Sequence, residues 1–175
     1  MSDEQKREEQ EEQKQRSGAG LFVKWALLVV IGLPVAWFAF CEARKAYWDW
    51  RVTQMCEKDG GVIVYQTIQL SDSEYKNLGG SYGAIPVPER RSSEDAPYVS
   101  DTTITNIRES NPRVARWEST IFRRADDIQL GKLVTYARVG GDFPTGIAHQ
   151  SSFSCRNLNI RLDIERQIFN VDGRR

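Results

Sequence analysis

A short segment in the last third of the chain holds the side chains best suited to chemistry, namely Asp142, His149, Ser151 and Ser152. A serine, a histidine and an acid are the residue types of a hydrolase triad, in which the histidine removes the serine proton and the acid orients the histidine. A triad depends on geometry in space, and neighbours within one loop cannot usually adopt it. A hydrolase that uses His149 with a nearby serine is therefore the alternative interpretation, and a loop without a reaction is the favoured one.

Metal and phosphate chemistry have no support in the sequence. His149 is the 1 histidine present, which excludes a site built from several histidines. Cys41, Cys56 and Cys155 are too far apart for the CxxC pairs of a zinc ribbon. The glycines of residues 79–83 follow a predicted helix rather than a strand, and no GxxxxGK[ST] motif exists. We expect no metal and no other cofactor.

Arginines recur along the predicted strands and form a candidate partner-binding set: Arg108, Arg116, Arg123, Arg124 and Arg138. Several of them would share the exposed face of one sheet, where guanidinium groups can bind anionic headgroups, an acidic partner or a cell-wall polymer. The alternative is a solvated sheet surface on which they pair with acids such as Glu118 and Asp126. Because Lys plus Arg and Asp plus Glu both total 24, no basic excess indicates nucleic-acid binding, and we expect no nucleic-acid partner.

Residues 21–40, LFVKWALLVVIGLPVAWFAF, form an apolar run with Lys24 as its single charge. At a rise of 1.5 Å per residue, a helix of this length spans roughly 30 Å, the thickness of a bilayer's hydrocarbon core. Trp25 and Trp37 lie near its ends, where amphipathic rings meet the headgroups. A cleaved signal peptide and a lipoprotein acylated at Cys41 fit less well, because the core is too long and the preceding Phe40 is bulky. The run predicts one transmembrane helix.

The flanks of this run divide the rest of the chain. Residues 1–20 are charged or amide-bearing with almost nothing to bury, which predicts a cytoplasmic tail that is disordered or transiently helical. Residues 41–56 lack Gly and Pro and predict a juxtamembrane extension of the helix. Residues 57–175 suffice for one small extracytoplasmic domain.

Lys and Arg are nearly balanced on the two sides of the apolar run, so the cysteines decide the predicted orientation. A bridge between Cys56 and Cys155 would close a loop of about 100 residues and stabilise the fold by roughly 4 to 5 kcal/mol. Disulfides persist in oxidising compartments, and the alternative is two separate buried thiols. The bridge predicts a single-pass protein of the cell inner membrane, with its N-terminus in the cytoplasm, its domain in the periplasm and Cys41 unpaired.

The first part of the domain mixes strand and helix signals. Residues 62–70 are rich in β-branched and aromatic types and predict a strand, first continuous and then alternating in pattern. Ser71 followed by Glu74 predicts a capped helix that runs to about Leu78. Residues 79–97 contain several Gly and Pro and predict a long loop.

The remainder predicts a sheet. Runs at residues 98–108, 114–124 and 132–139 are separated by short turns, which is typical of an antiparallel meander. Residues 140–150 predict a second loop, and residues 158–164 alternate with period two, which predicts a strand before a final short helix. The alternative is a helix throughout, because Ile160, Ile164 and Ile168 also fit one helical face. The expected class is α+β, with one N-terminal transmembrane helix followed by a small domain with a mainly antiparallel sheet and one or two short helices.

Two pairs of motifs carry a resemblance to a known group. CEKDGG at residues 56–61 is followed by Tyr65, and GGDF at residues 140–143 is followed by SSFSC at residues 151–155. Together they resemble a pattern in small single-pass cell-envelope proteins of proteobacteria, over roughly residues 50 to 156. The resemblance implies an envelope location and two cysteines held together, and it supplies no catalytic residue.

These observations favour a binding protein over an enzyme. The favoured interpretation is a membrane-anchored, non-enzymatic accessory protein whose extracytoplasmic domain binds through its loops and its arginine-bearing sheet face. The expected partners are the lipid bilayer and a membrane or periplasmic protein.

Overall fold

The structure, a computed structural model, describes residues 3–142 and 150–171. A long helix, α1 (Asp3–Asp59), is followed by a small domain with a mainly antiparallel sheet and two short α-helices, which is the predicted α+β class. The chain divides into two compact units, residues 1–43 and residues 44–175. Each is described by itself.

The first unit contains the apolar part of α1. Its large apolar side chains are more than half exposed, for example Val30 at 69% and Leu33 at 66%. Within the described chain, 1 helix is long and apolar enough to cross a membrane, with a mean hydropathy of 2.1 over its most apolar window. Pro34 lies inside this helix, a position that membrane spans tolerate.

Because α1 begins at Asp3, residues 3–20 are helical, although the sequence predicted a disordered or transiently helical tail. Glu, Gln, Lys and Arg are good helix formers. The costly step in helix formation is the first turn, and here the tail extends a helix that is already formed by the apolar run. The same continuity at the other end confirms the predicted helical extension over residues 41–56.

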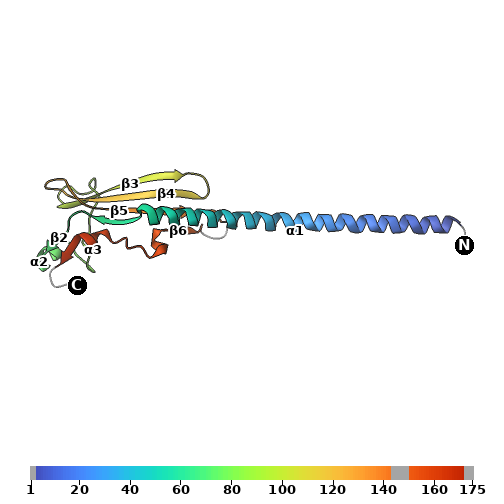
Figure 1. The fold of residues 1–175 in the computed structure, drawn as a ribbon, viewed down its shortest axis with the longest axis horizontal. Coiled ribbons are helices and arrows are strands. Elements are labelled where there is room, and N and C mark those ends of the chain that lie inside the picture. The colour runs from blue at the N-terminus through green and yellow to red at the C-terminus, as the bar shows by residue number, and fades with distance from the viewer. Residues whose placement is uncertain (1–2, 143–149, 172–175) are drawn as a thin grey trace. The chain divides into compact units, whose positions relative to one another are not determined.

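The second unit is built on a sheet of 5 strands in the order β1-β5-β4-β3, with β6 paired to β5 (Figure 1). The strands β3 (Tyr98–Arg108), β4 (Arg113–Arg123) and β5 (Ile128–Val139) form an antiparallel meander. The short strands β1 (Gly61–Val64) and β6 (Ser152–Ser154) pair with different parts of β5. The predicted meander is confirmed, and β3 is left as an edge strand.

The strand predicted for residues 62–70 is wrong, because the run divides between two sheets. β1 ends at Val64, and the N–H groups of Tyr65 and Gln66 both donate to the Leu130 carbonyl, at 2.9 and 3.0 Å. β2 (Ile68–Leu70) then pairs in parallel with β7 (Phe169–Val171). The change from a continuous to an alternating pattern within the run marks this division.

The predicted capped helix is confirmed as α2 (Asp72–Asn77). The Ser71 hydroxyl accepts the Glu74 N–H, and the Glu74 carboxylate accepts the Ser71 N–H at 2.8 Å. The turn that follows is folded against this helix, because the Tyr75 hydroxyl accepts the N–H of Gly83 at 2.9 Å. Residues 79–97 otherwise form the predicted long loop.

The strand predicted for residues 158–164 is also wrong. A 3-10 helix, η1 (Cys155–Leu158), ends where this segment begins, and an irregular stretch then leads to the predicted short helix, α3 (Ile164–Ile168). Its alternation has a different cause: Leu158, Ile160 and Leu162 pack on the core while the residues between them are exposed. The period of two therefore reflects an extended segment that buries one side without joining a sheet.

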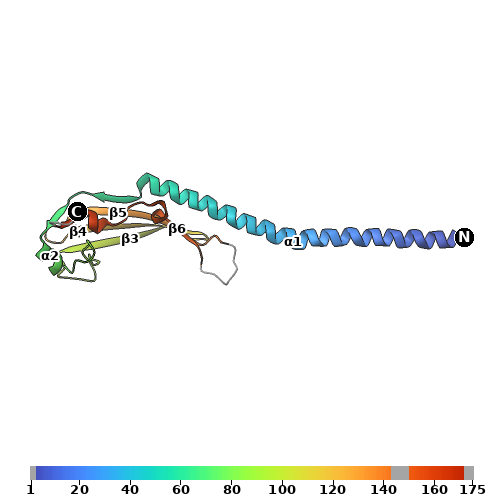
Figure 2. The same ribbon diagram turned by 90° about the horizontal axis from the view of Figure 1, so that it is seen from below.

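Two hydrophobic cores hold the unit together. One contains Ile121, Leu130, Ile164, Ile168 and Phe169, among others, beside the small β2-β7 sheet. The other core lies between the last turns of α1 and the sheet, which Figure 2 draws beside each other. It contains Val52, Cys56, Val114, Val134, Tyr136 and Cys155. A disulfide between Cys56 and Cys155 crosses the second core, as the sequence predicted, and Cys41 is free.

Candidate functional site

The five arginines of the predicted partner-binding set do not share one exposed face. Arg138 lies opposite Val114, and Arg116 opposite Tyr136, so both point to the side of the sheet that α1 covers. Arg138 is only 1% exposed. Arg123 lies at the far end of β4, with Arg124 just beyond it. The Asp49 partner of Arg138 and the loop carbonyls that bind Arg124 are distant in sequence, so strand periodicity could not place these two side chains.

Arg138 braces the end of the sheet against α1. Its Nε donates to Asp49 Oδ1 at 2.5 Å, and its Nη1 donates to the carbonyl of Gly140. Both terminal nitrogens also lie 3.2 Å from the hydroxyl of Ser151. One buried guanidinium thus joins three segments, and the carboxylate of Asp49 balances its charge.

Asp142 completes this network. Its carboxylate accepts the N–H and the hydroxyl of Ser151, both at 2.6 Å, and Lys45 Nζ lies 3.7 Å away. Desolvation by burial acts to raise the pKa of Asp142, but the two hydrogen bonds from Ser151 and the charges of Lys45 and Arg138 outweigh it, so the pKa lies below its usual range.

The contacts of Ser151 do not match those of the serine in a hydrolase triad. The Ser151 hydroxyl donates its hydrogen bond to the Asp142 carboxylate, whereas the hydroxyl of a catalytic serine donates to a base such as histidine. Ser152 is exposed at the start of β6. His149 lies outside the described residues. Among the described residues, Ser151 joins the loop to the sheet through its hydrogen bonds with Asp142 and Arg138.

A second polar cluster lies on the same face, around Arg116. Its guanidinium contacts Glu118 at 2.6 Å and donates to the Tyr136 hydroxyl at 3.2 Å, and that hydroxyl donates to the Asp59 carboxylate at 2.8 Å. Burial and the hydrogen bond to Asp59 raise the pKa of Tyr136. The hydrogen bond from Lys132 is the largest cause that lowers the pKa of Glu118. This cluster fixes the C-terminal end of α1 to the sheet.

The remaining three arginines are also engaged. The Arg108 guanidinium lies 5.2 Å from the Trp48 ring centroid and donates to the Pro112 carbonyl. Arg123 forms an ion pair with Asp126 at 2.9 Å. Arg124 donates to carbonyls of the loop before β3. The alternative interpretation, in which arginines pair within their own surface, therefore describes Arg116 and Arg123 better than a shared binding face does.

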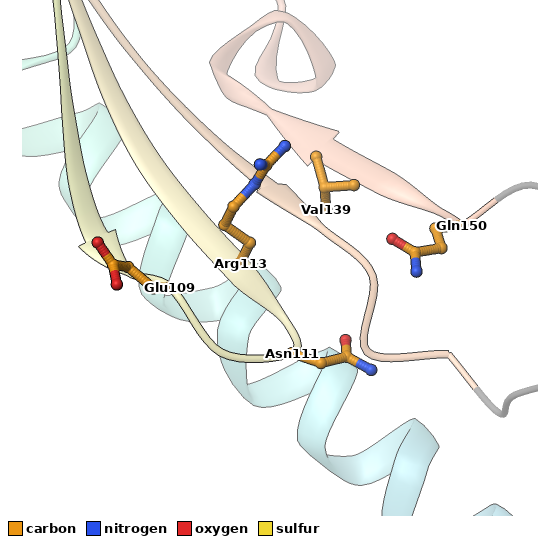
Figure 3. Close-up of a pocket in the computed structure, with 5 residues that line it drawn as sticks. All are labelled: Glu109, Asn111, Arg113, Val139 and Gln150. Carbon is orange, nitrogen blue, oxygen red and sulfur yellow. The ribbon is translucent and has the colours of Figure 1, made fainter.

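A hollow of about 330 Å³ lies at the turn between β3 and β4 (Figure 3). Its lining residues come from four segments and comprise Glu109, Asn111, Arg113, Val139 and Gln150. Figure 3 shows Glu109 past the end of β3, Arg113 at the start of β4 and Gln150 on the approach to β6. We call this site the turn hollow.

The base of the turn hollow is rigid. Asn111 Oδ1 accepts the Gly141 N–H at 2.6 Å, and Gly140 N–H donates to the Ser151 carbonyl at 2.9 Å. Gly140 has φ 86°, and a Cβ there would lie 2.6 Å from Asn111 Oδ1, so the close approach needs glycine. The buried Arg138 holds the same segment from below.

The two charged side chains of the turn hollow are available to a ligand. Glu109 and Arg113 are both exposed, and neither forms a side-chain hydrogen bond or an ion pair within residues 3–142 and 150–171. The turn hollow thus offers one carboxylate, one guanidinium and two side-chain amides on a rigid floor. Sequence reasoning missed it, although the Asn111-Pro112 turn between two strongly predicted strands gave its position.

No three Asp, Glu, His or Cys side chains in the described part of the chain gather where they could hold a metal ion. In comparisons with known proteins, no family model, no curated protein and no solved structure matches this chain.

Proposed function

We propose that this chain is a membrane-anchored binding protein without a reaction of its own. The apolar part of α1 crosses the bilayer once, and the domain binds a polar segment of a protein partner in the turn hollow. The observation that carries the proposal is the pair Glu109 and Arg113, which lie exposed in a hollow without a partner among the described residues. Charged groups gathered on a rigid concave surface favour recognition of a partner.

The rigid base supports binding rather than catalysis. The charged groups near the turn hollow that could act as an acid, a base or an anion site are Arg138 and Asp142. Both hydrogen-bond to other parts of the domain. The lowered pKa of Asp142 keeps it ionised at neutral pH, where its carboxylate accepts the hydrogen bond of the Ser151 hydroxyl and has no proton to give as a general acid. A site fixed in advance loses little entropy when a partner binds.

The location we propose is the cell inner membrane, with the N-terminus in the cytoplasm and the domain in the periplasm. The disulfide between Cys56 and Cys155 supports this orientation, because such bonds persist in oxidising compartments. The resemblance of the CEKDGG and SSFSC motifs to small envelope proteins of proteobacteria points the same way.

Charge reversal in the turn hollow tests the proposed function. The full chain is cross-linked in intact cells, extracted in mild detergent and purified, and partners are quantified by mass spectrometry. The double variant Glu109→Lys/Arg113→Glu is expected to lose the main protein adduct. The matched control, Arg91→Glu/Glu94→Lys, reverses one exposed base and one exposed acid elsewhere and should retain it. Equal adducts from both variants would reject the turn hollow as the binding site.

The hydrolase alternative has its own test. If His149 serves with a serine, His149→Ala abolishes the cellular phenotype while the adduct in the turn hollow persists. A binding protein retains both the phenotype and the adduct in that variant, and loses both in the Glu109→Lys/Arg113→Glu variant.

A further inference from the structure

The turn hollow lies at one end of the sheet face that points away from residues 44–59 of α1. Val114 belongs to the core beneath that part of α1. Because successive residues of a strand point to opposite faces, its neighbours Arg113 and Ala115 lie on the other side. Paired residues of adjacent strands share a face. We call this side the outer face, and it carries Ile104 of β3, Arg113, Ala115 and Trp117 of β4, and Thr135, Ala137 and Val139 of β5.

Trp117 has the largest side chain of the outer face, and among the described residues it belongs to neither hydrophobic core. It is half-buried, and Ile104, its partner across the β3-β4 ladder, is 58% exposed. Tryptophan is among the residues that most often dominate the binding energy of protein interfaces. The pair therefore offers an apolar anchor point that the fold itself does not use.

The surface between the turn hollow and Trp117 is uncharged and carries small side chains. Ala115 pairs with Ala137 midway along it, and Val139, which lines the turn hollow, lies on the same face. Trp117 follows Arg113 by four residues of β4, which corresponds to about 13 Å. An extended segment that begins in the turn hollow thus reaches Trp117 after about four of its own residues.

We propose that Trp117 and Ile104 anchor the same protein segment that fills the turn hollow, an inference that rests on the proposed function. The segment carries a base that meets Glu109 and an acid that meets Arg113. About four residues away, an apolar or aromatic side chain of the segment packs on Trp117. Charged contacts beside an apolar anchor match the polar rim and apolar centre of protein interfaces.

The shape of the turn hollow favours a different protein over a second copy of this chain. In a two-fold dimer the same surface patch of both copies meets itself. A dimer centred on the turn hollow would set one hollow against the other and leave both unfilled, whereas a segment that projects from a different protein fills the hollow and continues along the outer face. We therefore assign a different protein as the occupant.

Photocross-linking from two neighbouring positions of β3 tests the inference. A photoreactive amino acid replaces either Ile104 on the outer face or Thr103, which is also exposed and lies opposite Glu118 on the other face. The full chain is irradiated in intact cells, and adducts are identified by mass spectrometry. Position 104 should capture the protein that the wild type binds through the turn hollow, and position 103 should not. In the Glu109→Lys/Arg113→Glu background, capture from position 104 should be lost.

Substitution of the anchor gives a second measurement. Ile104→Asp places a charge beside Trp117 at an exposed position and is expected to lower the yield of the adduct about tenfold. Trp117→Ala should do the same, and urea unfolding shows whether that variant keeps the fold. Ile63→Asp is the matched control, because Ile63 is 50% exposed in β1 and lies opposite Lys132 on the other face. It should retain the adduct.

The outcomes separate this inference from the proposed function. If charge reversal abolishes the adduct but position 104 captures nothing, or captures no more than position 103, the anchor is overturned and the proposed function stands. If charge reversal leaves an adduct with a different protein unchanged, both are overturned. An adduct between two copies of this chain that survives charge reversal would overturn the choice of occupant, because the swapped charges of two copies still complement each other.

Discussion

The carboxylate of Asp49 in α1 and the buried guanidinium of Arg138 in β5 meet at 2.5 Å, although 89 residues separate them in the chain. Arg138 is 1% exposed, while the Asp49 side chain is 26% exposed. Burial of an arginine costs free energy that only a well-placed carboxylate and full hydrogen bonding offset. The pair therefore fixes α1 over the sheet and, through Gly140 and Ser151, holds the base of the turn hollow.

Asp49→Ala is expected to destabilise the domain because it leaves a buried guanidinium without its counter-charge. Loss of one partner of a buried ion pair lowers the free energy of unfolding by about 3 to 5 kcal/mol. Because Asp49 is partly exposed, we expect a decrease of about 3 kcal/mol. Urea unfolding of the full chain in micelles, followed by tryptophan fluorescence, measures it. Asp163→Ala is the control, since Asp163 is exposed and makes no side-chain cap hydrogen bond. A loss below about 1 kcal/mol for Asp49→Ala would contradict the brace.

Removal of the disulfide is expected to lower the free energy of unfolding more than Asp49→Ala does. The bridge joins cysteines 99 residues apart, and a loop of this length corresponds to about 4 to 5 kcal/mol in the chain-entropy model. The variant Cys56→Ser/Cys155→Ser should unfold at correspondingly lower urea, whereas Cys41→Ser retains the bridge. Thiol counting checks the pairing: the denatured chain should react once before reduction and three times after it.

The ionised carboxylate of Asp142 should stabilise the fold only above acidic pH. Its folded pKa is lowered, so its contribution is complete above the unfolded value of about 3.9 and is lost as the pH falls through the lower folded value. Wild type should therefore be more stable than Asp142→Asn at pH 7, and the difference should shrink below about pH 4. Thermal unfolding at several pH values measures this. A difference that stays constant into strong acid would show that charge plays no part.

Cysteine accessibility tests the proposed orientation. In a Cys41→Ser background, Glu94→Cys places a thiol in the exposed loop before β3, and Ser17→Cys places one on the other side of the apolar run. A membrane-impermeant maleimide applied to spheroplasts should label position 94 at once and position 17 only after permeabilisation. The reverse labelling pattern would show that the domain lies in the cytoplasm, which contradicts the proposed orientation.

The elements that could be predicted are those determined by local residue order. The Ser71 and Glu74 box predicted α2 because a cap needs only neighbours. The β3-β4-β5 meander followed from short turns between β-branched runs. The disulfide was predicted from the positions of Cys56 and Cys155 near the two ends of the domain, because a bridge between them closes a long loop.

The elements that failed depend on partners distant in sequence. Residues 62–70 divide because their halves meet β5 and β7, and nothing local indicates β7. Residues 158–164 alternate like a strand yet lie on a core without a neighbouring strand. Arg138 alternates with the buried Val134 and Tyr136, and its charge alone led us to predict that it is exposed; its pairing with Asp49, a helix residue, balances that charge in the core. The turn hollow gathers four segments, so its lining could not be read from any one of them.

The pairing of β2 with β7 and the bridge from Cys56 to Cys155 both join the opening of the domain to its closing stretch. Neither core can close before residues 155–171 have been synthesised, because Ile164, Ile168 and Phe169 complete one and Cys155 the other. Long-range closure of this kind is slow. Until it occurs, the strand edges and apolar side chains of the newly made domain stay uncovered, which is the state most prone to aggregation.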